Sequence, residues 1–106
     1  MDFLVKIFKA LANEQRIQLL RLLLGSEEKE ISELAHKLSL PYKTVARNLK
    51  ILEQTNLVNS RRWKGMVYYS LRNEPGLEYN KLLYDLIRKR FTRPNIDLTF
   101  LRKRER

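Results

Sequence analysis

The hydrophobic period of this chain switches from helical to strand-like near Leu57, and this switch restricts the fold more than any other feature. Before Leu57, apolar residues recur three and four positions apart, a spacing typical of amphipathic helices. From Leu57 to Leu71 they alternate around a Lys64-Gly65 pair, which indicates a β-hairpin with a glycine turn. Because 106 residues with 43% hydrophobic composition can build one core, we expect a single domain of helices with one small hairpin.

Capping side chains, prolines and glycines mark where the helices start and end. The expected helices are a first at Phe3–Leu11, a second from the cap Asn13 to Gly25, a third from the cap Ser32 to Ser39-Leu40, a fourth from Pro41 to Gln54, and a last from about Leu77 to Phe91. This order, α-α-α-α-β-β-α, is that of a winged helix-turn-helix, in which the fourth helix enters the DNA major groove. We expect this domain to cover residues 1–91, with a basic C-terminal tail at 92–106 that forms an arm or a small added element.

The positive charge of the chain is unevenly distributed. Its net charge of +10 comes from 22 Lys/Arg and 12 Asp/Glu, but residues 1–41 hold six of each. Residues 42–85 hold eight basic and four acidic side chains, and residues 86–106 hold eight and two. A cationic surface alone could serve membranes or solubility, whereas this asymmetry favours a localised face that binds a polyanion.

Several classes of site have no support in the sequence. The chain lacks cysteine, which excludes disulfides, zinc-thiolate centres and thiol nucleophiles, and one histidine, His36, cannot make a selective transition-metal site. We see no phosphate loop, metal triad or nucleophile constellation, so we expect no enzyme activity, no cofactor and no metal. Without an apolar run of ~18 residues or a signal peptide, a cytoplasmic protein with no membrane partner is expected.

The fourth helix carries a basic row. Its apolar stripe of Val45, Leu49 and Leu52 should hold the helix to the domain, with Tyr42 toward the core side and Ile51 covered by the base of the hairpin. The residues expected to point outward are Lys43, Arg47, Lys50 and Gln54. Lysine and arginine can contact phosphates or guanine, asparagine can pair with adenine, and threonine can reach either a phosphate or a thymine methyl. The predicted DNA contacts are Tyr42, Lys43, Thr44, Arg47, Asn48 and Lys50 on this helix, and Arg61, Arg62 and Lys64 at the hairpin tip.

Apolar residues in the first and last helices exceed what one small core can use. Left exposed, they would form a large apolar patch, which a two-fold dimer would cover. The predicted dimerisation residues are Phe3, Leu4, Ile7 and Phe8 of the first helix and Leu82, Leu83, Leu86 and Ile87 of the last. A protein- or RNA-binding winged-helix module that uses its basic surface is the alternative reading.

Several motifs, in order, resemble those of the ArsR-type (arsenical-resistance-repressor-like) regulators. They are Ala10–Arg16 (ALANEQR), Glu33-Leu34-Ala35, Lys43–Leu52 (KTVARNLKIL), Leu57-Val58 and Val67-Tyr68-Tyr69. The resemblance implies a homodimeric bacterial or archaeal transcription regulator, usually a repressor, with its recognition helix at Pro41–Gln54 and its wing at Asn59–Leu71. The family often has serine and histidine where this chain has Ala46 and Asn48, so the operator sequence does not carry over. The cysteines of the family's metal sensors are also absent from the matching stretch, Glu30–Leu34.

Overall fold

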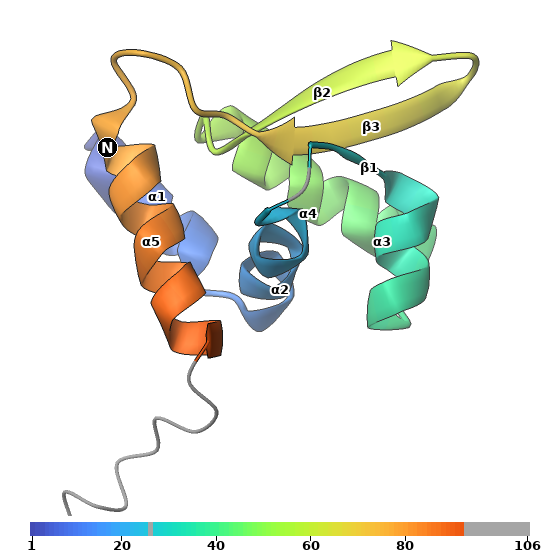
Figure 1. The fold of residues 1–106 in the computed structure, drawn as a ribbon, viewed down its shortest axis with the longest axis horizontal. Coiled ribbons are helices and arrows are strands. Elements are labelled where there is room, and N and C mark those ends of the chain that lie inside the picture. The colour runs from blue at the N-terminus through green and yellow to red at the C-terminus, as the bar shows by residue number, and fades with distance from the viewer. Residues whose placement is uncertain (26, 93–106) are drawn as a thin grey trace, which may run out of the picture.

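The computed structural model describes residues 1–25 and 27–92, and its helices lie on one side of a small sheet whose hairpin projects beyond them (Figure 1). The helices are α1 (Phe3–Leu11), α2 (Glu14–Leu23), α3 (Ile31–Leu38), α4 (Tyr42–Gln54) and α5 (Glu78–Thr92). The strands are β1 (Lys29–Glu30), β2 (Val58–Trp63) and β3 (Met66–Leu71). The predicted winged helix-turn-helix is therefore confirmed. Apart from Thr92, which ends α5, the predicted basic tail lies outside the described residues.

The helix boundaries follow local capping chemistry, with two differences from expectation. The Oδ1 atom of Asn13 accepts a hydrogen bond from the backbone N–H of Arg16 at 3.1 Å, which confirms the predicted cap of α2. Ser32 does not cap α3, because this helix begins at Ile31, directly after β1. Pro41 is the residue before α4, with an extended backbone (φ −60°, ψ 145°), rather than part of its first turn.

The hairpin has the predicted turn. Lys64 and Gly65 both have left-handed backbones (φ 49° and 77°), as a two-residue hairpin turn of the type I′ class requires. β2 and β3 pair antiparallel, from Val58 opposite Leu71 to Trp63 opposite Met66. The short strand β1 was not predicted, since two residues are too few to show a period. It pairs with β3 and places that strand in the centre of the sheet.

The core lies between the helices and one face of the sheet. α2 is central to it, because α1, α4 and α5 all pack against this helix. The fully buried side chains are mainly leucines, together with Ile7, Val45 and Val58. These leucines are Leu19, Leu20, Leu23, Leu34, Leu49, Leu52 and Leu57.

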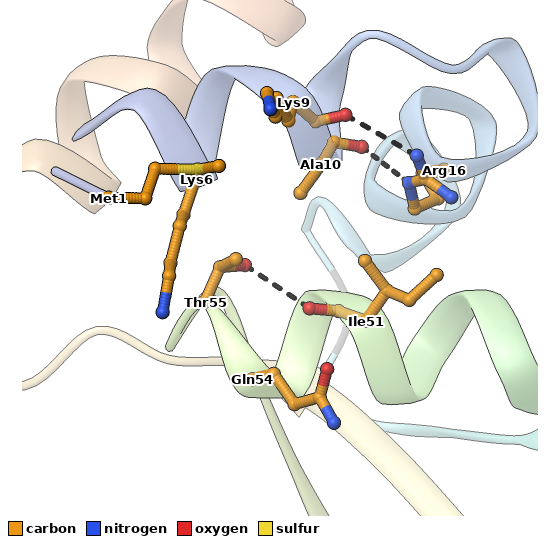
Figure 2. A pocket seen from close by; sticks show the side chains of 8 residues that line it. All are labelled: Met1, Lys6, Lys9, Ala10, Arg16, Ile51, Gln54 and Thr55. Atoms are coloured by element: carbon orange, nitrogen blue, oxygen red, sulfur yellow. Dashed lines mark hydrogen bonds between the residues drawn. The ribbon is translucent and has the colours of Figure 1, made fainter. Parts of the chain in front are cut away.

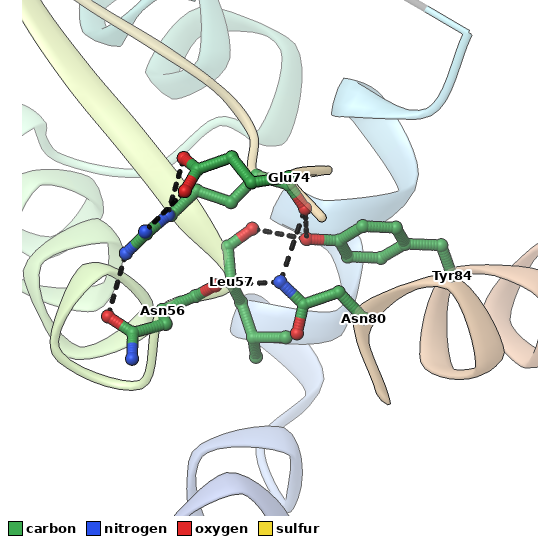
Figure 3. Close-up of polar contacts among 6 residues, drawn as sticks. Asn56, Leu57, Glu74, Asn80 and Tyr84 are labelled. Carbon is green, nitrogen blue, oxygen red and sulfur yellow. Dashed lines mark hydrogen bonds and ion pairs between the residues drawn. The ribbon is translucent and has the colours of Figure 1, made fainter. Parts of the chain in front are cut away.

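A polar cluster holds α5 to the end of the hairpin (Figure 3). The hydroxyl of Tyr84 lies 2.5 Å from the carbonyl oxygen of Leu57 and 2.9 Å from that of Arg72. The Nδ2 atom of Asn80 donates to the carbonyl oxygens of Asn56 (2.8 Å) and Arg72 (3.2 Å). Burial raises the pKa of Tyr84 to about 12. The chain after the wing is thus fixed by α5 side chains.

Replacing Tyr84 with phenylalanine is expected to lower the free energy of unfolding by about 0.5–1.5 kcal/mol at pH 7. The loss is modest because each carbonyl keeps a second donor, the N–H of Arg72 for Leu57 and Asn80 for Arg72. Since folding raises the pKa of Tyr84 from 10.0 to about 12, its contribution is present below pH 10 and disappears as the pH rises through 12. Urea unfolding of both proteins at pH 7 and pH 11 measures this. Tyr79→Phe, at an exposed tyrosine of α5, is the control and should match the wild type.

Candidate nucleic-acid interface

The basic row of α4 points away from the domain. Val45, Leu49 and Leu52 are completely buried and fix the rotation of the helix about its axis. On the other side, the four residues predicted to face outward are all exposed, namely Lys43, Arg47, Lys50 and Gln54. The predicted orientation of α4 is therefore confirmed.

Two residues flanking this row differ from the helical-wheel expectation. Tyr42 is exposed rather than turned toward the core, because it is the first residue of α4 and no earlier turn of the helix packs beside it. Thr44, which is also a predicted DNA contact, is half-buried. Ile51 is not covered by the hairpin but lines a recess between α4 and α1. Tyr42 is therefore available beside the row, and Ile51 belongs to another surface.

The prediction that Asn48 faces DNA is wrong. Its side chain is 7% exposed, and its Oδ1 atom accepts a hydrogen bond from Nη1 of Arg16 at 2.9 Å. Its Nδ2 atom donates to Oε1 of Gln15, also at 2.9 Å. The sequence did contain a signal for this: Asn48 stands three residues after Val45 and four before Leu52, which is the buried side of the helix.

Arg16 is the functional candidate that sequence reasoning missed, because it entered only as part of a family motif. Besides binding Asn48, its guanidinium donates from Nε to the carbonyl oxygen of Ala10 (2.5 Å) and from Nη2 to that of Lys9 (3.4 Å). Those carbonyls are at the C-terminal end of α1, where a positive charge is favourable. One side chain of α2 thus connects α1 to the recognition helix.

The cations of the wing are not equivalent. Arg61 makes a bidentate ion pair with Glu28, with Nε lying 2.8 and 3.0 Å from the two carboxylate oxygens. The hydrogen bond from Arg61 lowers the pKa of Glu28, so the two charges compensate each other at neutral pH. Among the residues that the structure describes, no salt bridge involves Arg62 or Lys64. Within the described chain, Arg62 and Lys64 are therefore the tip cations without a carboxylate partner, with Lys64 lying over the ring of Trp63. Arg61 is held by Glu28, and its contact with a DNA phosphate stays a prediction.

Glu53 ties the recognition helix to the wing. Its Oε2 atom accepts a hydrogen bond from the hydroxyl of Ser60 (2.6 Å), and its Oε1 atom accepts one from Tyr69 (3.4 Å). Burial, followed by the charge of Glu53, raises the pKa of Tyr69, so this phenol stays protonated and can donate. The basic row and the wing are thereby held in one arrangement.

The predicted dimerisation residues divide into two groups. Phe3, Leu4, Phe8, Leu82 and Leu86 are exposed, the last two by 68% and 65%. Ile7 and Ile87 are only 1% and 5% exposed and belong to the core, and Leu83 packs partly against it. These three face inward because the stripes of α1 and α5 are broad, and their inner edges bury against α2. We define the five exposed residues as the apolar patch.

The described residues offer little for other kinds of site. Within residues 1–25 and 27–92, no helix is long and apolar enough to span a membrane. Over the same residues, no three His, Cys, Asp or Glu side chains gather where they could hold a metal ion.

Comparison with known proteins identifies the family. The family model described as HVO_A0114 matches residues 11–70. The chain is 34% identical over 82 residues to the transcriptional activator HlyU of Vibrio cholerae, a match that covers 77% of this chain and 75% of HlyU. It is also 34% identical over 70 residues to the HTH-type transcriptional regulator KmtR of Mycobacterium tuberculosis, covering 66% of this chain and about half (53%) of KmtR.

Solved structures agree with the sequence matches. HlyU of Vibrio cholerae superimposes with a TM-score of 0.74 at 30% identity, over 86% of this chain and 94% of HlyU. The homodimeric winged helix-turn-helix DNA-binding domain of Mb0332 from Mycobacterium bovis gives a TM-score of 0.70 at 30% identity, over 82% and 76%. The fold, the exposed basic helix and these relatives define a winged helix-turn-helix transcription regulator that binds DNA. The chain belongs to the ArsR/SmtB family of such regulators.

Proposed function

We propose that this protein binds a palindromic operator as a two-fold dimer and represses transcription from it. The observation that carries the proposal is the exposed basic row of α4, held by Glu53 in a fixed relation to a wing with a cationic tip. In this arrangement Lys43 and Arg47 read base edges, whereas Arg62 and Lys64 grip phosphates beside the groove. Lys50, Thr44 and the exposed Tyr42 add contacts at the groove walls. A regulator of this kind would act on the chromosome, in the cytoplasm of a bacterium or archaeon.

Dimerisation through the apolar patch would complete the binding unit. A two-fold axis would place two recognition helices about 34 Å apart, on successive major grooves. The operator would then be an imperfect palindrome with half-site centres roughly 10 bp, or a multiple of it, apart. Bound there, a dimer would occupy DNA that polymerase needs, which is why we infer repression. Because the relative HlyU is named an activator, in vitro transcription with and without the protein decides whether this protein represses or activates.

The primary test is selective retention of DNA. A duplex taken from upstream of the protein's own coding sequence is incubated with the protein in excess competitor DNA. Sequence-selective retention supports an operator-binding regulator. Equal loss to every polyanion, RNA included, contradicts the proposal and favours a general basic module.

Alanine at Arg47 and at Lys64 should have different consequences. Arg47→Ala is expected to cost about 1–3 kcal/mol on the preferred operator and to relax sequence choice, because a base contact is lost. Lys64→Ala should weaken all duplexes alike and lower the salt slope of binding by about one, because a phosphate contact is lost. Fluorescence anisotropy on specific and random duplexes at several salt concentrations measures both. Equal losses on the two duplexes for Arg47→Ala would refute its assignment as a base reader.

A further inference from the structure

A recess of about 480 Å³ opens between α1 and α4 (Figure 2). The residues that line it are Met1, Lys6, Lys9, Ala10, Arg16, Ile51, Gln54 and Thr55. Three of them are basic and none is acidic. In the described part of the chain, no salt bridge involves Lys6, Lys9 or Arg16, so these three charges are left without a carboxylate partner. Such a recess attracts a small anion with more than one negative charge.

The remaining lining adds an apolar floor. Ala10 is buried and Ile51 is half-buried, and Figure 2 shows the side chain of Ile51 on the same side of α4 as Arg16. Thr55 is also buried there, but its hydroxyl already donates to the carbonyl oxygen of Leu52 at 2.9 Å. An anion that carried a compact apolar body would therefore fill the recess better than a bare inorganic ion.

The recess borders the DNA-facing row of α4 and lies mostly to one side of the apolar patch. At about 100° per residue, Lys6 and Lys9 lie about 100–160° around α1 from Leu4 and Phe8 of the apolar patch, whereas Lys6 is about 60° from Phe3. On α4, Ile51 lies only about 40° around the helix from Arg47 and about 60° from Gln54, and Gln54 itself lines the recess. Pairing through Leu4, Phe8 and the α5 leucines would leave most of the recess open, and an anion bound there would lie beside the face that meets DNA.

We propose that this recess binds a small organic phosphate monoester, and that its binding weakens the affinity of the protein for DNA. A phosphate monoester carries about 1.5–2 negative charges at neutral pH, which suits two lysines with an arginine behind them. The second half of the proposal rests on the proposed function. Arg16 links the recess to Asn48 of the recognition helix at 2.9 Å, so an anion drawn to Arg16 acts on the group that positions α4. It also adds negative charge close to the DNA-binding surface.

The binding test uses phenyl phosphate as the probe, with phenol as its neutral counterpart, at constant ionic strength and without DNA. Two-dimensional NMR of the protein should show saturable shifts at the amides of Lys6, Lys9 and Thr55, and phenol should cause none. The double variant Lys6→Gln/Lys9→Gln should bind phenyl phosphate at least tenfold more weakly. The matched control Lys37→Gln/Lys81→Gln removes the same charge elsewhere and should bind like the wild type. Shifts spread over the basic row and wing, no saturation, or equal losses in both variants would overturn the site.

The coupling test adds the operator duplex. Saturating phenyl phosphate should weaken operator binding three- to tenfold in the wild type and leave the Lys6→Gln/Lys9→Gln variant unchanged. Without ligand, that variant should keep the salt slope of the wild type; a slope lower by about two would assign these lysines to DNA phosphates and overturn the small-molecule assignment. Anion binding with unchanged operator affinity would refute the coupling alone. If the protein binds phenyl phosphate but retains no duplex selectively in competitor DNA, the anion site stands and the proposed function is contradicted.

Discussion

Glutamate at both Leu82 and Leu86 is expected to give a folded monomer whose operator affinity is at least 100-fold lower. Both side chains are exposed, so the fold loses little when they change. In a dimer built on the apolar patch, each glutamate would be buried without a partner, which is strongly unfavourable. A monomer holds one half-site and loses the gain from linking two binding events, roughly 10²–10⁴ in affinity. Sedimentation velocity at tens of micromolar, circular dichroism and anisotropy on the operator measure the three effects.

Ile87→Glu is the contrasting variant for this experiment. Because Ile87 lies in the core, its replacement should unfold the chain instead of yielding a monomer. A wild-type protein that sediments as a monomer at tens of micromolar would rule out the dimer. A folded Leu82→Glu/Leu86→Glu protein with unchanged operator affinity would show that the patch serves another purpose.

Arg16→Leu is expected to lower the free energy of unfolding by about 2–4 kcal/mol. The buried Oδ1 atom of Asn48 loses its charged donor, and the carbonyl oxygen of Ala10 loses the Nε donor at 2.5 Å. Operator affinity should fall as well, because α4 loses its link to α1. The control is Arg21→Leu, which removes an arginine of the same helix whose side chain, among the described residues, is hydrogen-bonded to Gln18 alone and packed over Phe91. We expect it to cost less than about 1 kcal/mol.

A double-mutant cycle separates the Arg16–Asn48 pair from general damage to the helix. Arg16→Leu, Asn48→Leu and the double variant should show a coupling energy of about 1–3 kcal/mol in urea unfolding. If the two single changes simply add, the hydrogen bond at 2.9 Å contributes nothing specific. The connection from α1 through α2 to the recognition helix would then be wrong.

Features set by neighbouring residues could be predicted from the sequence, whereas features set by distant partners could not. The Asn13 cap and the Lys64-Gly65 turn need only local chemistry, and both are present as expected. The burial of Asn48 and the ion pair of Arg61 were not predicted, because their partners, Arg16 and Glu28, lie 32 and 33 residues away. A helical wheel shows which polar residues border the buried side, but it cannot tell which of them find a partner there.

The breadth of an apolar stripe caused a similar error at the chain ends. Ile7 and Ile87 share faces with exposed residues such as Phe8 and Leu86, so periodicity alone places them together. Only the packing of α1 and α5 against α2 divides each stripe into an inner edge and an outer edge. The predicted set of dimerisation residues therefore contained both, and five of its eight members remain as the apolar patch.

The pairing of Arg61 with Glu28 divides the wing into an anchored base and an overhanging tip. Arg61 pairs with Tyr68 across the two strands, so the residues from Arg62 to Val67 extend beyond the Arg61–Glu28 ion pair. At about 3.3 Å per residue, this part of the hairpin is roughly 10 Å long. Over this overhang β2 buries none of its side chains. Residues 62–66 are all exposed, whereas Val67 packs partly against the core, so the length and charge of the tip up to Met66 can vary with little loss to the core. If the tip contacts the DNA backbone as proposed, a few substitutions there would change the affinity for DNA without affecting the folding of the domain.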